Sequence, residues 1–441
     1  MANTYLSRTF GTPTNASKFT ISVWVKRGTL GAANILMFAN GGNAQNFSNL
    51  MFTGDSLFWH VLNSNSEVSK IKSSAIYRDT SGWYHVVFNW DSTQSTASNR
   101  TKMYVNGVQL DSFSTQTNSA QNTNYHINTA VEHIIGAEKG NTGGSVGNYF
   151  DGSMSHYHFI DGTTYDASAF GETDATTGEW KIKTSPSVTY GTNGFFILKD
   201  GNSVTDQSGN SNNFTVGGGT LTKTEDCPSN VFATLNPLVR HTGTVANGNT
   251  RYGTSSSSWI GIPATLGNLT GKWYWEYKLT TGAEWSQCGI VSQAGYNGIL
   301  TSYVGGITNG VAMNTGGGDI YTAGGSAQAW FGSARSVGQI ISVALDCDNN
   351  KIYWGTNGVW GNSSNPATGS NGYSIPSALN TDKPYFPAFS VHNCTIDINF
   401  GNGYFGTTAV ASAGTNASGI GIFEYDVPTG FTALSTKGLN L

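Results

Sequence analysis

A chain of 441 residues with a net charge of −4 at pH 7 predicts two or three domains and lacks the basic patch that nucleic-acid binding requires. Only 11% of residues are charged and 12% are aromatic, so the chain can bury large cores while uncharged polar groups keep it in solution. No apolar run is long enough to cross a membrane, and the first residues do not read as a secretory signal. Four scattered cysteines without a CxxC pair disfavour a disulfide framework or a zinc site.

The first predicted elements along the chain are β-strands, because apolar and polar residues alternate in short runs and helical periodicity is almost absent. Residues 19–26 alternate in this way. Residues 84–90 are apolar on both faces, so we expect this strand at the centre of a sheet. Residues 102–105 lead into an Asn-Gly turn, and residues 150–161 form a further strand. This spacing of short strands and turns is typical of an all-β sandwich.

The order of these segments, FTISVWVKR, GWYHVVFNWD, KMYVNGVQL and YFDGSMSHYHFIDG, resembles the laminin-G-like, concanavalin-A-like sandwich. We assign residues 1–167 to this domain. The resemblance implies a domain used for recognition, in a superfold that also includes glycan hydrolases.

Residues 168–238 show a weaker pattern and are predicted to be an irregular linker or connecting module, with a hinge near Pro228 and Pro237. The segment CPSNVFATLNP, residues 227–237, resembles junctions in structural proteins of marine tailed phages. The chain's last residues, FEYDVPTGFTALSTKGLNL, resemble the C-terminal tails of those proteins.

Residues 239–441 are predicted to form a second sandwich with a C-terminal tail. Its strongest signal is IISVALDCDNNKIYWGTNGVW, residues 340–360, where two alternating strands flank a turn at residues 348–350 and a second tight turn follows at Asn357-Gly358. Trp273, Trp275 and Tyr277 alternate with polar or charged neighbours in an earlier strand. The order of these strands resembles the SPRY domain, a β-sandwich that serves recognition. The predicted fold is therefore all-β, with two tandem sandwiches joined by an irregular linker.

The sequence shows no catalytic constellation, and we expect no enzyme activity. A glycan hydrolase of the concanavalin-A-like type needs two carboxylates beside the scissile bond. The nearest match, Glu172-Thr173-Asp174-Ala175-Thr176, has Thr where a third carboxylate belongs. No nucleophile elbow or phosphate loop is present.

The candidate metal sites in the sequence also lack some of the ligands that they would need. His156 and His158 have the spacing of a metal pair on one strand face, but no third ligand is visible, and two ordinary strand histidines explain them as well. The run from Asp346 to Asn349 looks like the start of a calcium loop, but later ligand positions fail, which favours a hairpin turn. Laminin-G-like domains sometimes bind calcium, and Asp151 and Asp161 lie at strand ends. We therefore predict no cofactor and no metal, with calcium left open.

End loops are where recognition sandwiches bind their partners. In the second domain the loop aromatics Trp285, Tyr303 and Trp330 are the candidate ligand-binding residues, since exposed rings stack on sugars or anchor proteins. The alternative is that each ring covers the end of its own core. In the first domain Trp59 and Tyr149 are weaker candidates.

These resemblances predict a non-enzymatic structural protein of a tailed-phage virion, assembled in the host cytoplasm. Its expected role is a tail-fibre, tip or receptor-binding component that contacts other virion proteins and a host surface glycan or protein. No coiled shaft or anchoring segment is visible, which favours a tip, knob or surface-decoration protein over a shaft. A trimer held by sandwich faces is the expected oligomer. The alternatives are a capsid decoration or head-fibre protein and, further off, a free lectin or glycan hydrolase.

Overall fold

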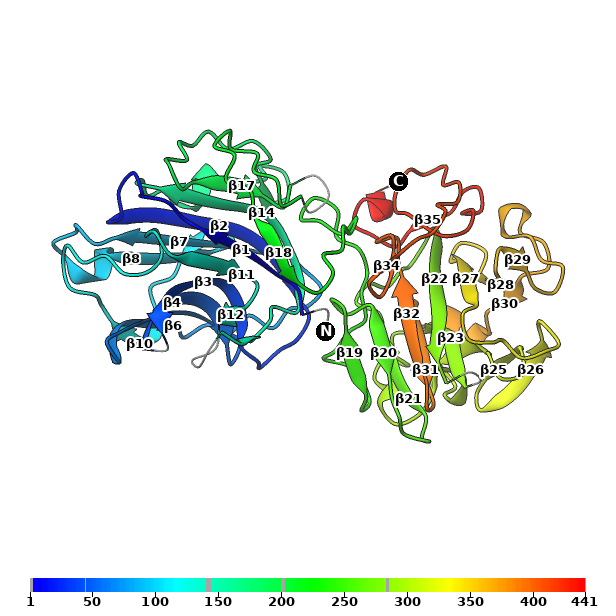
Figure 1. The fold of residues 1–441 in the computed structure, drawn as a ribbon. Helices are drawn as coiled ribbons and strands as arrows, with labels where there is room; N and C mark the ends of the chain where they lie inside the picture. The colour runs from blue at the N-terminus through cyan, green and yellow to red at the C-terminus, as the bar shows by residue number, and fades with distance from the viewer. Residues whose placement is uncertain (1–2, 44, 140–143, 200–202, 283–284, 441) are drawn as a thin grey trace. The chain divides into compact units, whose positions relative to one another are not determined.

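The computed structural model describes residues 3–43, 45–139, 144–199, 203–282 and 285–440. The chain divides into two compact units, Met1–Lys223 and Thr224–Leu441. The regular secondary structure of each unit is almost entirely β-strand, as the sequence predicts (Figure 1).

Two sheets packed on a common core form the first unit in the described part of the chain. One sheet consists of β1 (Tyr5–Thr9), β3 (Asn34–Asn43), β4 (Asn46–Thr53), β5 (Ser56–Asn63), β6 (Ser66–Ser73), β10 (Phe113–Thr117), β11 (Glu132–Ile135) and β18 (Thr215–Gly218), in the order β10-β6-β5-β4-β3-β11-β1-β18. The other consists of β2 (Lys18–Arg27), β7 (Tyr84–Asp91), β8 (Thr101–Val105), β9 (Val108–Gln109), β14 (Gly152–Asp161) and β17 (Phe195–Ile197), in the order β17-β14-β2-β7-β8-β9. Short elements complete it: β12 (Glu138–Lys139), β13 (Val146–Gly147), β15 (Gly171–Thr173), β16 (Trp180–Ile182), η1 (Ala97–Asn99) and η2 (Ala167–Ala169).

Strand β7 is central, between β2 and β8, as its two apolar faces predict. On one face Phe88 and Trp90 enter the core between the two sheets. On the other face Val87 joins a second apolar cluster that includes Phe170 and the half-buried Trp180. The chain that follows β14 thus covers the outer face of this sheet.

Residues 168–223 belong to the first unit, which differs from the predicted boundary of the connecting module. Strand β17 pairs with β14, and β18 pairs with β1. The Trp180 ring lies nearly coplanar beside the buried His85 ring and donates its indole N–H to His85 Nδ1 at 3.0 Å. The Asp206 carboxylate accepts the backbone N–H groups of Phe196 and Asn212, each at 2.8 Å. Side-chain hydrogen bonds to the backbone therefore act together with buried side chains such as Phe195 and Phe214 to fix this segment.

The second unit is also a two-sheet sandwich in its described residues. One sheet consists of β19 (Thr244–Ala246), β20 (Arg251–Gly253), β22 (Lys272–Thr281), β27 (Ile340–Asp346), β28 (Lys351–Thr356), β29 (Val359–Trp360), β30 (Tyr373–Ser374), β32 (Thr395–Asn399) and β35 (Thr432–Ala433), with the path β19-β20-β32-β22-β27-β28-β29. The other consists of β21 (Ile260–Pro263), β23 (Ser286–Val291), β24 (Gly310–Asn314), β25 (Asp319–Thr322), β26 (Gly325–Ala329) and β31 (Phe386–Val391), in the order β21-β31-β23-β24-β25-β26. Smaller elements are β33 (Tyr404–Phe405), β34 (Thr408–Ala409), α1 (Ser377–Asn380), η3 (Gly298–Leu300), η4 (Val304–Gly306), η5 (Pro366–Thr368) and η6 (Gly438–Asn440).

The hairpin predicted from residues 340–360 is present as β27, β28 and β29. Its first turn is closed by Asp346, whose carboxylate accepts the backbone N–H groups of Asp348 at 3.1 Å and Asn349 at 2.9 Å. Asn350 and Asn357 adopt the left-handed backbone angles that such turns need. The acidic residues of this run therefore have a structural role in the turn.

The C-terminal tail packs on the outer face of β22, β27 and β28. Phe423, Val427 and Phe431 form an apolar cluster there with Tyr274 and Tyr353. Beneath them the buried Glu276 carboxylate accepts the backbone N–H groups of Glu424 and Tyr425, each at 2.9 Å, and the Tyr274 hydroxyl. Burial raises the pKa of Glu276 to about 7.

Candidate ligand-binding site

Two of the three predicted binding residues come together at one end of the second unit. Trp285 and Tyr303 both lie against Trp259, with ring centroids 6.4 and 5.2 Å away. The His392 ring lies 5.5 Å from Trp259 and 5.8 Å from Trp285. We call these four residues, Trp259, Trp285, Tyr303 and His392, the aromatic platform.

Four separate connections supply the platform: the loop between β20 and β21, the one between β22 and β23, the start of η4, and the turn between β31 and β32. Backbone hydrogen bonds hold three of them together. His392 donates its N–H to the Trp285 carbonyl at 2.9 Å, and Asn393 donates to the Ser256 carbonyl at 2.9 Å. Asn393 adopts a left-handed backbone angle at the centre of this arrangement. The rings are therefore held on hydrogen-bonded loops at the end of a rigid sandwich.

The platform is partly open to solvent. Trp285 is 49% exposed, and Trp259, Tyr303 and His392 are half-buried. Indole and phenol rings bury large apolar area at little entropic cost, and their N–H and O–H groups add polar contacts. Such a surface suits the apolar face of a sugar ring or an anchoring side chain of a protein partner.

Trp330 does not join the platform. It is 3% exposed, and its indole N–H donates to the Trp354 carbonyl at 2.8 Å. A side chain at Gly361 would come within 2.4 Å of the Trp330 ring, so that glycine makes room for it. Trp330 therefore covers the end of its own core, which is the alternative to ligand binding that the sequence left open.

Trp259 and His392 are platform residues that the sequence analysis did not single out. Trp259 follows a run of four serines and directly precedes β21. A tryptophan at the end of a polar loop is the sequence feature that could have identified it as a binding residue. His392 carries no comparable signal. Its buried ring atom Nδ1 makes no hydrogen bond to any described residue.

Of the two weaker candidates in the first unit, Trp59 lies in the interior and Tyr149 is half-buried at the surface. Trp59 is 1% exposed and donates its indole N–H to the Ser69 hydroxyl at 3.1 Å. Tyr149 is half-buried and donates its hydroxyl to the Val146 carbonyl. The aromatic neighbours of Trp59 are the buried core rings Phe19, Phe88 and Trp90, and Tyr149 lies against Tyr5.

The predicted histidine pair does not share a regular strand face. A bulge in β14 interrupts the pairing between Ser155 and His158, and His156 has a left-handed backbone angle. The His158 ring is buried, stacks on Phe196 at 3.9 Å and shares a hydrogen bond with the Tyr190 hydroxyl. Burial lowers the pKa of His158 well below its usual value, which keeps the ring neutral.

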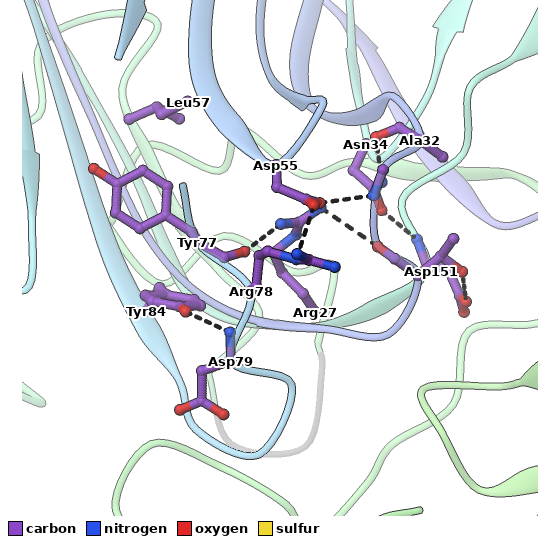
Figure 2. Close-up of polar contacts among 12 residues, drawn as sticks. Arg27, Ala32, Asn34, Asp55, Leu57, Tyr77, Arg78, Asp79, Tyr84 and Asp151 are labelled. Atoms are coloured by element: carbon purple, nitrogen blue, oxygen red, sulfur yellow. Dashed lines mark hydrogen bonds and ion pairs between the residues drawn. The ribbon is translucent and has the colours of Figure 1, made fainter. Parts of the chain in front are cut away.

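Asp151, one of the residues considered for calcium, lies in a polar network at the edge of the first unit. Figure 2 shows Asp55 close to both Arg27 and Arg78, and Asp151 beside Asn34. The Asp55 carboxylate lies 3.0 Å from the Arg27 guanidinium and 3.4 Å from that of Arg78. Asp151 donates its backbone N–H to Asn34 and accepts the Thr29 hydroxyl on its carboxylate. This network ties the loop after β2 to the rest of the sandwich.

Asp161, the other residue considered, is buried with four donors around it. Its carboxylate accepts the backbone N–H groups of Thr14 at 2.6 Å, Asn193 at 3.0 Å and Asn15 at 3.2 Å, and the Asn128 amide at 2.8 Å. Within the part of the chain that the structure describes, no group of three His, Cys, Asp or Glu residues is placed to hold a metal ion. None of the described helices is long and apolar enough to cross a membrane.

Residues 2–168 match the family model of the concanavalin A-like lectin/glucanases superfamily, which supports the predicted laminin-G-like, concanavalin-A-like first domain. No curated protein is significantly similar to the chain. Among solved structures, the SPRY domain of human HERC1 shares 15% identity over 37% of this chain and 96% of its own, with a TM-score of 0.29. A second human SPRY domain shares 16% over 34% and 90%, with a TM-score of 0.27. A heptameric SAP-like pentraxin from Limulus polyphemus shares 18% over 37% and 71%, with a TM-score of 0.28.

Proposed function

We propose that this protein is a non-enzymatic component of a tailed-phage particle that attaches to a glycan or protein on the host surface, as a tail tip or receptor-binding protein. The observation that carries the recognition role is the aromatic platform, because four loops hold its rings at the end of a sandwich. The match of residues 2–168 to a lectin-like family adds support for glycan binding.

Support for the particle role comes from the two segments that resemble marine phage proteins, residues 227–237 and the C-terminal tail. These segments pair with each other within the second unit. Ala233 donates its N–H to the Leu434 carbonyl, and Thr436 donates to the Val231 carbonyl, each at 2.9 Å. The two stretches therefore lie side by side in one part of the fold. Their joint resemblance to phage proteins is expected if that part of the fold is common to them.

Tracing the chain in a cryo-electron microscopy map of the particle that encodes it tests the particle role. Density at the distal end of the tail supports the proposal. A place on the capsid lattice makes the protein a decoration or head-fibre protein instead. Absence from purified particles, checked by mass spectrometry, overturns the proposal and favours a free lectin or hydrolase.

Recognition is tested separately with the purified full-length chain on host cells. We expect Trp285→Ala to reduce cell binding at least tenfold, because exposed tryptophans commonly dominate binding energy. Leu269→Ala is the matched control, since Leu269 is 59% exposed in the same unit but lies outside the platform. Equal binding by the wild type and the Trp285 variant would remove the platform from the proposal.

A further inference from the structure

Every ring of the aromatic platform carries a polar group that bonds to no described residue. The Trp259 indole N–H and the Tyr303 hydroxyl have no hydrogen-bond partner among the described residues, and neither atom is closed to solvent. The same holds for the indole N–H of Trp285, a residue that is 49% exposed. Of the two His392 ring nitrogens, only Nδ1 is buried. The platform therefore offers several hydrogen-bonding groups beside apolar ring surface.

Elsewhere in the chain, indole N–H groups serve the fold. They donate to a hydroxyl, a ring nitrogen or a backbone carbonyl in Trp59, Trp180, Trp273, Trp330 and Trp354. Trp259 and Trp285 make no such bond to a described residue, so their N–H groups remain for water or for a ligand. A ligand without acceptors would take these donors out of water unpaired, which costs binding free energy. The platform thus favours a ligand that brings hydrogen-bonding groups of its own.

The polar groups lie close together because the six-stranded sheet places three of the rings in one row. Strand β31 pairs with β21 on one side and with β23 on the other, antiparallel in both cases. Trp259 directly precedes β21, Trp285 directly precedes β23 and His392 directly follows β31, so they meet at adjacent strand ends. Neighbouring ring centroids in the platform are 5.2 to 6.4 Å apart. A ligand of the size of a sugar ring on Trp285 therefore also reaches Trp259.

Charged groups of the second unit are engaged away from the platform. Among the described residues, the cations that contact carboxylates or aromatic rings of this unit do so elsewhere: Arg251, Lys272, Lys278, Arg335 and Lys383. A carboxylate or sulfate on a ligand would lose water at the platform without meeting one of these cations. This arrangement favours an uncharged ligand.

We propose that the aromatic platform binds one residue of a neutral glycan. The apolar face of the sugar stacks on Trp285, and its hydroxyl groups bond to the Trp259 indole N–H and the Tyr303 hydroxyl. A neutral sugar supplies both a surface for stacking and acceptors for these donors, whereas an apolar side chain of a protein partner would leave the donors unpaired. This inference rests on the proposed recognition function; it names the ligand class and two residues that select it.

The test measures binding of the full-length chain to an immobilised array of neutral hexose oligosaccharides and of sulfated, sialylated and uronic-acid glycans. We expect neutral glycans to bind, with affinities that change less than about twofold between about 50 and 500 mM NaCl, because no charge pair is involved. Tyr303→Phe removes one hydroxyl and keeps the ring, so it should weaken binding about threefold to tenfold, as expected for one lost hydrogen bond. Trp259→Phe removes the indole N–H and should weaken binding at least as much.

Tyr373→Phe is the matched control and should bind like the wild type. Tyr373 is a half-buried tyrosine on β30, which pairs with β28 in the other sheet of the second unit. Thermal unfolding identifies a Trp259 variant that has lost its fold, and the conservative Tyr303 variant still decides the question in that case.

Wild-type affinity of both Tyr303→Phe and Trp259→Phe, with loss only in Trp285→Ala, overturns the assigned hydrogen bonds. Preference for acidic glycans overturns the neutral ligand class. Binding of no glycan, while attachment to host cells still depends on Trp285, overturns glycan recognition in favour of a protein receptor and leaves the proposed recognition role standing. Attachment that is independent of Trp285 overturns both.

Discussion

The hold of the C-terminal tail on the second unit is expected to weaken as pH rises from 5 to 8, through Glu276. Burial raises the pKa of this carboxyl from an ordinary value of 4.5 to about 7, although two backbone N–H groups and the Tyr274 hydroxyl donate to it. The nearby Glu424 carboxylate contributes in the same direction. Between about pH 4.5 and 7, Glu276 is protonated when the tail is docked over it. It is ionised in this range when the tail opens and exposes it to solvent.

The sign and size follow from this difference. The stabilisation is fully present below pH 4.5 and is lost as pH rises through about 7, because the docked state must then bury a charge. A rise of the pKa from 4.5 to about 7 corresponds to about 3 kcal/mol. Tail opening should therefore become about 3 kcal/mol easier across this range.

Hydrogen–deuterium exchange of the full-length chain, corrected for the intrinsic pH dependence of exchange, measures this opening in peptides that cover residues 420–431. The Glu276→Gln variant should lose the pH dependence and start about 1–3 kcal/mol less protected at pH 5, because an amide nitrogen faces a backbone N–H. Glu225→Gln, at an exposed position of the same unit, should keep the wild-type profile. An unchanged slope in Glu276→Gln, or a flat wild-type profile, would refute the reasoning.

Three further predictions concern stability, each measured by urea-induced unfolding of the full-length chain. Asp55→Ala should cost about 3–5 kcal/mol, because it leaves the buried Arg27 guanidinium without its carboxylate; a loss below 1 kcal/mol would contradict this. Trp180→Ala should cost about 1–3 kcal/mol by uncovering His85 and the outer sheet face, and full stability would show that the cover is not needed. Trp330→Ala should cost about 3–5 kcal/mol yet leave glycan binding within twofold where the chain stays folded, and selective loss of binding would return this ring to the site.

Strands with strong local alternation were predictable because their signal lies within a few consecutive residues. Strands β2, β7 and β22 and the hairpin of β27 and β28 all occur where the sequence predicts them. Each carries apolar residues on its core-facing side, and tight Asn-containing turns bound several of them. Local pattern and tertiary burial agree at these positions, so the sequence alone suffices.

Residues 168–223 were less predictable because distant groups hold them in place. The Asn210 side-chain amide donates to the backbone carbonyls of Gly191 and Gly194. Arg8, about 200 residues earlier in the sequence, donates to the Asn212 side chain. A polar, glycine-rich sequence gives no periodic signal for such contacts. The platform has the same character: Trp259 and His392 meet only because β21 pairs with β31, the strand that His392 follows. The buried position of the Trp330 ring likewise depends on the space that Gly361 leaves by having no side chain.

The openness of the proposed site bears on how the protein would work on a particle. A half-exposed platform encloses only part of a ligand, so each copy should bind weakly. Several copies held on one particle turn later contacts into intramolecular ones, which raises avidity by roughly 10²–10⁴-fold without any new contact. Weak single sites then allow reversible search on a host surface, while the assembled particle stays attached.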